Sequence, residues 1–220
     1  MTWLDSDASR RRFLASGALA LSASALRAPS IAALRRSAVG GADRWLDRLD
    51  GEERQLFDFP DPRDAVPLGH ILHFYDTYNE VYGIEDRKLN AVGTFYGKTI
   101  PFAFADRSWA RFRLGELLEV PDPETGRPAE RNPWRITPHV RGVPTERAGI
   151  EALQARGVIF LACQAAVRSL AGKISARDGA PIAGLVSALE TSLLPGVELV
   201  PSMVIAIQRA QRRGLSYYRL

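Results

Sequence analysis

The sequence predicts a three-layer α/β fold, in which helices cover both faces of a mainly parallel sheet of four or five strands and a helical extension precedes the sheet. Three observations support this prediction. Apolar runs of strand length alternate with segments of helical periodicity from residue 89 onward. The run at 158–162 is apolar at every position, as in a strand buried on both faces of a parallel sheet. A composition of 46% hydrophobic and 25% charged residues is typical of a globular protein.

The first elements follow from periodicity and from the residues that end them. A short amphipathic helix is expected at 42–50 and a short extended piece at 55–59. Apolar residues at three- and four-residue steps predict a helix over 68–82, which Gly83 ends. Small and β-branched residues predict a buried strand over 89–96.

The middle of the chain combines a short apolar run, a helix and a long loop. The run at 100–104 is expected to form a short strand and leads to Asp106, an expected N-cap for a helix that carries Trp109 on its apolar stripe. Six prolines between residues 119 and 145 predict a long structured loop, and loops of this length are usually functional or disordered.

The last third alternates strands and helices of ordinary length. Thr145 is expected to cap the first of these helices. The predicted elements are a helix at 146–156, a strand at 158–162, helices at 164–170 and 181–193, a strand at 197–200, a helix at 203–212 and a strand at 215–218.

The N-terminus has the three-part layout of an export signal. Arg10 and Arg11 stand before Phe13 and Leu14, a weakly apolar segment follows to residue 26, and Ala23-Ser24-Ala25 supplies small residues for cleavage. The paired arginines are typical of the twin-arginine route, which carries folded proteins. We therefore expect a periplasmic protein whose signal contacts the membrane transiently, or anchors the chain if it is not cleaved.

The sequence divides into a signal at 1–25, a linker and N-terminal extension at 26–67, and an α/β domain at 68–220. The formal net charge of +4 is mild and the basic residues are spread along the chain, so nucleic-acid binding is not expected. No segment after the signal has the run of about 18 apolar residues that a transmembrane helix needs.

Three segments of the last third carry a resemblance to a known family. They read Gly157-Val158-x-Phe160-x-x-Cys163, Leu194-Pro195-Gly196-Val197-x-Leu199-Val200-Pro201-Ser202 and Gln208-Arg209-Ala210-Gln211-x-x-Gly214-x-x-Tyr217. In this order they resemble the DsrE/DsrF-like family of small α/β proteins linked with sulfur relay, and the central region resembles an exported subgroup of undetermined role. The resemblance implies the fold of residues 68–220, an oligomer, and a sulfur-carrying cysteine in some members. Met203 and Gln164 depart from the family pattern.

Cys163 is the only cysteine and the first candidate for chemistry. It is expected where a buried strand ends and a helix begins, a position that lowers the pKa of a thiol and favours the thiolate that accepts sulfur as a persulfide. A free cysteine is also among the most buried residue types, so Cys163 is either reactive or a packing residue. An intramolecular disulfide is excluded.

Other polar residues could line the crevice at the ends of the strands. Asp106 and Trp109 follow one apolar run, Arg168 could hold an anion near the thiol, and Ser202 starts a helix after the strand at 197–200. Capping, packing and solvation explain the same residues without function. His70 and His73 lack a third local ligand, so neither a metal nor a cofactor is expected.

Two functions from different classes remain open. The first is a non-catalytic binding or assembly subunit that uses the loop at 119–145 and the N-terminal extension as contact surfaces. The second is a sulfur-relay protein that carries sulfane sulfur on Cys163. The apolar C-terminus is either covered by residues 42–59 or paired with another subunit, so a protein partner or a homo-oligomer is expected; its apolar residues are Ile205, Ile207, Leu215, Tyr217 and Tyr218.

Overall fold

The computed structural model describes residues 41–220. The predicted export signal, with Arg10, Arg11, Phe13 and Leu14, lies outside the described residues. Among the residues described, no helix has the length and apolar character needed to cross a membrane.

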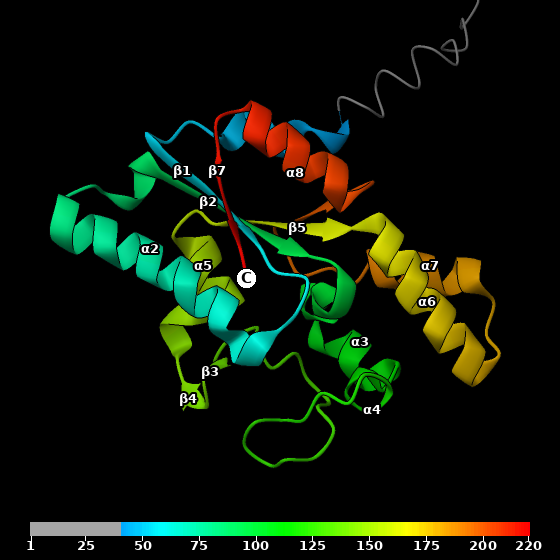
Figure 1. The fold of residues 1–220 in the computed structure, drawn as a ribbon. Helices are drawn as coiled ribbons and strands as arrows, with labels where there is room; N and C mark the ends of the chain where they lie inside the picture. Colours follow the sequence, from blue (N-terminus) through cyan, green and yellow to red (C-terminus); the bar gives the residue numbers. More distant parts are fainter. Residues whose placement is uncertain (1–40) are drawn as a thin grey trace, which may run out of the picture. The chain divides into compact units, whose positions relative to one another are not determined.

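A five-stranded parallel sheet forms the centre of the fold (Figure 1), and this confirms the predicted fold class. Its strand order is β6-β5-β2-β1-β7, so the last strand of the chain lies at one edge and pairs only with the first. The strands are β1 (Glu53–Asp58), β2 (Leu89–Phe95), β5 (Ile159–Cys163), β6 (Val197–Val200) and β7 (Ser216–Arg219).

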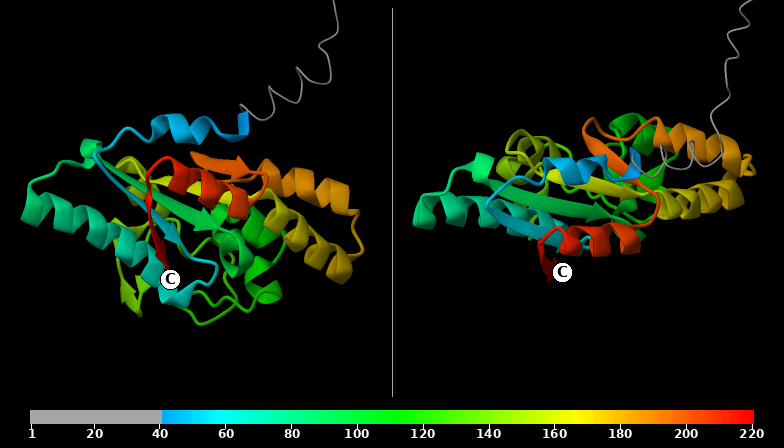
Figure 2. Two further views of the ribbon diagram at one scale, coloured as in Figure 1. Left: turned by 45° about the horizontal axis from the view of Figure 1, so that its top comes forward. Right: turned by 90° about the horizontal axis from the view of Figure 1, so that it is seen from above.

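Helices cover both faces of the sheet (Figures 1 and 2). One face, called here the α2 side, carries six helices, and the other face, the α8 side, carries α8 and the 3-10 helix η1. The α2 side comprises α2 (Val66–Tyr82), α3 (Asp106–Arg111), α4 (Leu114–Leu117), α5 (Ile150–Ala155), α6 (Gln164–Asp178) and α7 (Ile182–Glu190); the α8 side comprises α8 (Met203–Arg212) and η1 (Arg44–Arg48).

The strand alternation divides the core into two clusters. Phe95 and Phe160 pack on the α2 side, where their rings stack with centroids 5.1 Å apart. Val92 and Leu161 pack on the α8 side. Successive side chains of a strand point to opposite faces, and here both faces of the sheet are covered. Every position of β2 and β5 is therefore buried, as the apolar run at 158–162 predicts.

The N-terminal extension is part of this core. β1 pairs with β2 on one side and β7 on the other, so the sheet begins before residue 68, the start predicted for the α/β domain. Trp45 and Leu46 of η1 are buried against the α8 side of the sheet. The expected short helix at 42–50 is therefore a 3-10 helix whose apolar side chains are used within the chain.

Two local predictions were wrong, and a third was confirmed only in part. The run at 100–104 lies in a 3-10 helix, η4 (Gly97–Ala103), and its C-cap, Phe104. Gly97 takes a left-handed φ of 58° at the start of η4, and Pro101 has no backbone N–H to donate to a neighbouring strand. Asp106 is the first residue of α3, and Ala105 is the N-cap. Thr145 is the N-cap residue of the 3-10 helix η5 (Glu146–Ala148), as predicted, but its hydroxyl donates to the carbonyl of Val143 instead of accepting from the helix.

The proline-rich loop between α4 and α5 is held to the α2 side of the fold. The amide of Asn132 donates to the carbonyls of Phe102 (2.7 Å) and Phe104 (2.9 Å), and Trp134 stacks on Phe102 with ring centroids 3.9 Å apart. The loop ends in a short hairpin of β3 (His139–Val140) and β4 (Val143–Pro144). Trp134 is 5% exposed, so the loop is structured, as its prolines predict.

Candidate functional site at the carboxyl ends of the strands

The connections after β5 and β6 leave the sheet on opposite faces. α6 follows β5 and packs on the α2 side, and α8 follows β6 and packs on the α8 side. In an open parallel sheet, the crevice between two such strands is the usual place for a ligand. Cys163 ends β5 and is the N-cap of α6, and Ser202 is the N-cap of α8, so both flank this point.

Cys163 is buried on the α8 side of the sheet, with 6% of its surface exposed. It belongs to the apolar cluster that contains Val200 and Met203, and Tyr96 packs against that cluster. The next residue, Gln164, turns its amide to Glu190 of α7 at 2.9 Å rather than to the thiol. These surroundings are those of a cysteine that packs in a core. The position of Cys163 at the N-terminus of α6 is also one where reactive cysteines occur.

A second polar group lies nearby, at the carboxyl ends of β1 and β2 and against β7. The carboxylate of Asp58 is 1% exposed and accepts hydrogen bonds from Tyr217 (2.5 Å) and Thr94 (3.3 Å). Burial, and then the Asp58 carboxylate, raise the pKa of Tyr96 and the pKa of Tyr217 above the ordinary value. Both phenols therefore stay protonated across the physiological range and act as hydrogen-bond donors.

The other predicted crevice residues have different surroundings. The carboxylate of Asp106 accepts hydrogen bonds from the guanidinium of Arg135 (2.7 Å) and from the backbone N–H of Asn132 (3.0 Å). Asp106 therefore anchors the proline-rich loop. Trp109 is fully buried, and its indole N–H donates to the carbonyl of Pro101 at 3.1 Å. Arg168 lies exposed in the second turn of α6. Of the predicted set, the structure places Cys163 and Ser202 on neighbouring strand ends and uses Asp106 and Trp109 in packing.

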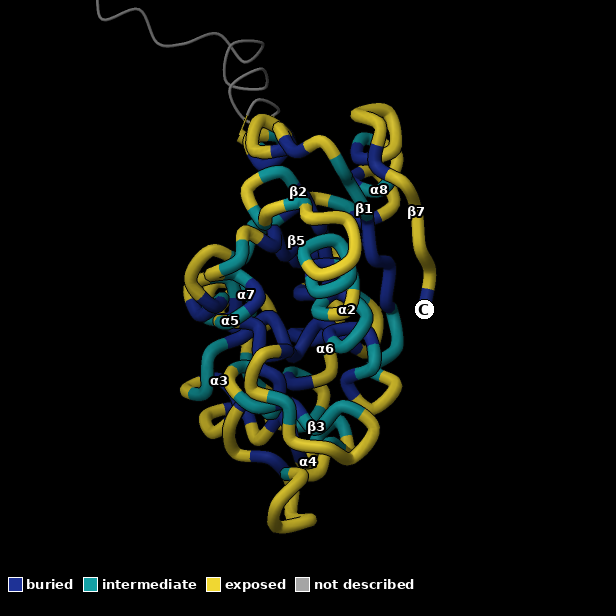
Figure 3. Tube along the Cα trace, turned by 90° about the vertical axis from the view of Figure 1, so that its left-hand side faces the viewer, coloured by how far each residue is buried: buried dark blue, intermediate teal, exposed yellow. Residues whose placement is uncertain are grey.

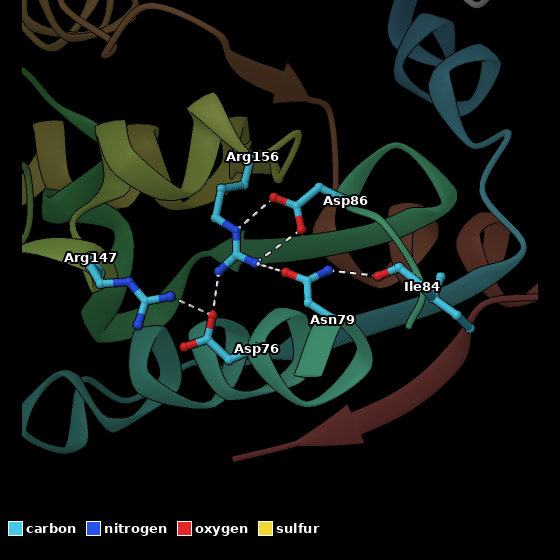
Figure 4. Close-up of polar contacts among 6 residues, drawn as sticks. All are labelled: Asp76, Asn79, Ile84, Asp86, Arg147 and Arg156. Carbon is cyan, nitrogen blue, oxygen red and sulfur yellow. Dashed lines mark hydrogen bonds and ion pairs between the residues drawn. The ribbon is translucent and has the colours of Figure 1, made fainter. Parts of the chain in front are cut away.

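An ionic cluster lies elsewhere, around Arg156 at the end of α5 (Figure 4). Its guanidinium contacts Asp76 (2.7 Å), Asp86 (2.8 Å) and Asn79 (2.7 Å), and lies over the Tyr75 ring at 4.7 Å. Two carboxylates raise the pKa of Arg156, and Arg156 lowers the pKa of Asp86. Four of the five N–H donors of the guanidinium have partners within the chain, so this cluster joins α5, α2 and the turn before β2 rather than holding a ligand.

The histidines do not form a metal site. His70 stacks on Tyr218 with ring centroids 5.6 Å apart, and His73 contacts Thr77 at 3.5 Å. His139 lies in the β3–β4 hairpin. Within residues 41–220, no group of three or more metal-ligating side chains comes together.

The sheet has two edge strands, β6 and β7, and β7 is the more exposed of the two. All four residues of β7 are exposed, although Tyr217 and Tyr218 are large aromatic residues with 41% and 40% of their surface exposed. Figure 3 shows this exposed strand beside the buried β1, at the margin of the molecule. Residues 42–59 cover part of the apolar C-terminus, because η1 packs in one cluster with Leu215 and β1 pairs with the inner edge of β7. Within residues 41–220 no further strand pairs with the outer edge of β7.

Sequence reasoning did not find the group around Asp58. A signal for part of it was present, because Asp58 ends β1 and Tyr96 directly follows β2, and the carboxyl ends of parallel strands meet at one edge. This signal does not identify the group, because the sequence does not show that the extended piece at 55–59 belongs to the sheet.

No protein-family model matches the chain, and no curated protein shows significant similarity to it.

Proposed function

We propose that the chain is a non-catalytic binding or assembly subunit of the DsrE-like type, exported to the periplasm by the twin-arginine route. The observation that carries this proposal is the open edge of the sheet at β7, where two large aromatic residues remain exposed. An unpaired strand edge is a template for another strand, and proteins that leave one open commonly use it for association.

The two contact surfaces expected from the sequence are less suited to this role than β7. The N-terminal extension has buried Trp45 and Leu46 in its own core, and the proline-rich loop is tied down through Asn132 and Trp134. The edge of β7 has neither restraint on its outer side.

Changing the edge and the thiol separately tests this function. Arg219→Pro removes a backbone donor at the edge, and Cys163→Ser removes the thiol. In periplasmic extracts, the wild-type chain and Cys163→Ser should migrate in a complex larger than one chain, whereas Arg219→Pro should not. Loss of the complex in Cys163→Ser alone would contradict the proposal.

Export is tested in the same cells. Replacing Arg10 and Arg11 with lysine should hold the chain in the cytoplasm, because the paired arginines are the address that the export receptor reads. Arg12→Lys is the matched control, since Arg12 occupies the variable position between the pair and Phe13. Unchanged fractionation of the paired variant would count against this route.

A sulfur relay is the second candidate, and one observation favours it: Cys163 stands at the head of α6, at the point where the connections of neighbouring strands diverge. In that reaction the Cys163 thiolate attacks the sulfane sulfur of a thiosulfate donor, a Cys–S–S⁻ persulfide forms, and sulfite leaves. Burial of the thiol in the cluster of Val200 and Met203 opposes this reaction.

A further inference from the structure

The backbone of β7 presents two of its four residues to the open side. The amide of Leu220 donates to the carbonyl of Asp58 in β1 at 2.9 Å. Backbone N–H and C=O groups of a strand residue point to the same side and alternate from one residue to the next. Tyr218 therefore faces β1 with its backbone groups, and Tyr217 and Arg219 direct theirs away from the sheet.

The side chains of β7 alternate between the two faces. Tyr218 lies on the α2 side, where it stacks on His70 and meets Phe57 edge-on with ring centroids 6.0 Å apart. Tyr217 lies on the α8 side, where its hydroxyl reaches Asp58. Arg219 is two residues further on and shares the face of Tyr217.

We propose that a second copy of this chain pairs its β7 antiparallel with this edge, across a two-fold axis through Tyr218, so that one sheet runs through both copies. The proposal rests on the assembly function proposed above and names its partner. A two-fold axis perpendicular to the sheet keeps the α2 sides of both copies together, as antiparallel pairing requires, because directly opposite residues share a face.

The side chains of β7 are complementary to themselves in this register. Tyr217 of each copy stands opposite Arg219 of the other, and both residues point their backbone groups outward, so each pair exchanges two backbone hydrogen bonds. A guanidinium placed on a tyrosine ring is a favourable contact. Tyr218 of one copy stands opposite Tyr218 of the other in the central, non-hydrogen-bonded pair. Aromatic cross-strand neighbours approach most closely in such a pair.

Other registers are less complementary. An axis through Arg219 would place two like charges opposite each other, which destabilises a strand pair. An axis through Tyr217 would pair Arg219 with residue 215, which precedes the first residue of β7, Ser216. A two-fold axis between two residues would place side chains from opposite faces in one pair, which the pleat does not allow.

Disulfide formation tests the register. The full chain carries Cys163→Ser, and cysteine is placed singly at Ser216, Tyr217, Tyr218 or Arg219 before mild oxidation. Only Tyr218→Cys should cross-link rapidly to a covalent dimer, because directly opposed residues of such a pair have Cα atoms about 4.5 Å apart, within the range of a disulfide. Equal rates at all four positions, or the highest rate at another position, would overturn the proposal.

Light scattering on the purified full chain tests self-association. The wild type should have twice the chain mass of 24.2 kDa at micromolar concentration. Arg219→Pro should have the mass of one chain and remain folded, because the lost N–H points away from β1 and proline is tolerated at such an edge position. Arg219→Ala keeps this N–H and should associate more tightly than Arg219→Pro.

The two proposals fail in different ways. A wild-type mass of one chain would overturn the pairing of two copies, whether the edge is covered by residues 1–40 or takes a strand of another protein. If the periplasmic complex still depends on the β7 edge in that case, the assembly function stands with a different partner. If the complex is lost in Cys163→Ser instead, the assembly function itself is contradicted.

Discussion

The hydroxyl of Tyr217, in the last strand, donates a hydrogen bond of 2.5 Å to the carboxylate of Asp58 at the end of the first strand. Asp58 is 1% exposed, and Thr94 also donates to its carboxylate, at 3.3 Å. A buried carboxylate is costly unless its oxygens are hydrogen-bonded. Tyr217 therefore both satisfies Asp58 and holds the edge strand β7 against β1.

Removing this hydrogen bond should destabilise the fold. Tyr217→Phe should lower the free energy of unfolding by about 1.5–3 kcal/mol, the range for a hydrogen bond to a charged group. Urea unfolding measures the change. Tyr218→Phe is the matched control and should change the free energy by less than about 0.5 kcal/mol, because stacking on His70 needs no hydroxyl. Equal effects of the two variants would contradict this role for Tyr217.

The cluster around Arg156 should be the most sensitive ionic site. Arg156→Met leaves Asp76 and Asp86 without their shared partner, and the free energy of unfolding should fall by about 3 kcal/mol. Arg147→Met is the control, because Arg147 also contacts Asp76 but has 66% of its side chain exposed; the expected loss is below about 1 kcal/mol. A small effect of Arg156→Met would mean that the cluster is not a structural link.

The same cluster predicts a pH dependence. Hydrogen bonds from Arg156 lower the pKa of Asp86 below its unfolded value. The stability that Asp86 contributes is therefore present above the unfolded pKa of about 3.9 and is lost as the pH falls through the lowered, folded pKa. The difference in unfolding free energy between wild type and Arg156→Met should be largest near neutral pH and should narrow below about pH 4. A difference that stays constant through the acid range would contradict this assignment.

Gly115 of α4 should tolerate no side chain. A Cβ at this position would overlap the backbone nitrogen and oxygen of Ala129 in the proline-rich loop. Gly115→Ala should therefore displace the loop and lower the free energy of unfolding by about 1–3 kcal/mol. Gly172→Ala is the control in α6, where a Cβ meets no atom within 4 Å, and it should raise stability by about 0.5–1 kcal/mol. Equal thermal stability of the two variants would contradict this packing.

Much of the fold follows from local patterns in the sequence. The apolar runs of β2 and β5 are buried on both faces, and the predicted helix over 68–82 ends where Gly83 adopts a φ of 67°. The run at 100–104 misled because apolar content alone does not separate a strand from a 3-10 helix. The predicted cap at Asp106 was wrong because Asn132 and Arg135, far along the chain, compete for the same carboxylate.

The candidate site was less predictable than the fold. The position of Cys163 at a strand end follows from the apolar run before it, and the structure has it there. Its burial depends on Val200 and on α8, which reach it through the order of strands in the sheet, and periodicity does not encode that order. The pairing of β1 with β7, which creates both the Asp58 group and the open edge, is a contact between the two ends of the described chain.

The chemical state of Cys163 tests the central claim most directly, because an assembly subunit needs no reactive thiol. The folded full chain and the same chain in denaturant are incubated with thiosulfate or polysulfide, and the intact mass is measured. We predict that the folded chain gains no sulfur, whereas the unfolded chain, with Cys163 exposed, is modified by polysulfide. A folded chain that gains one sulfur atom, with the gain absent in Cys163→Ser, would contradict the account and favour sulfur relay.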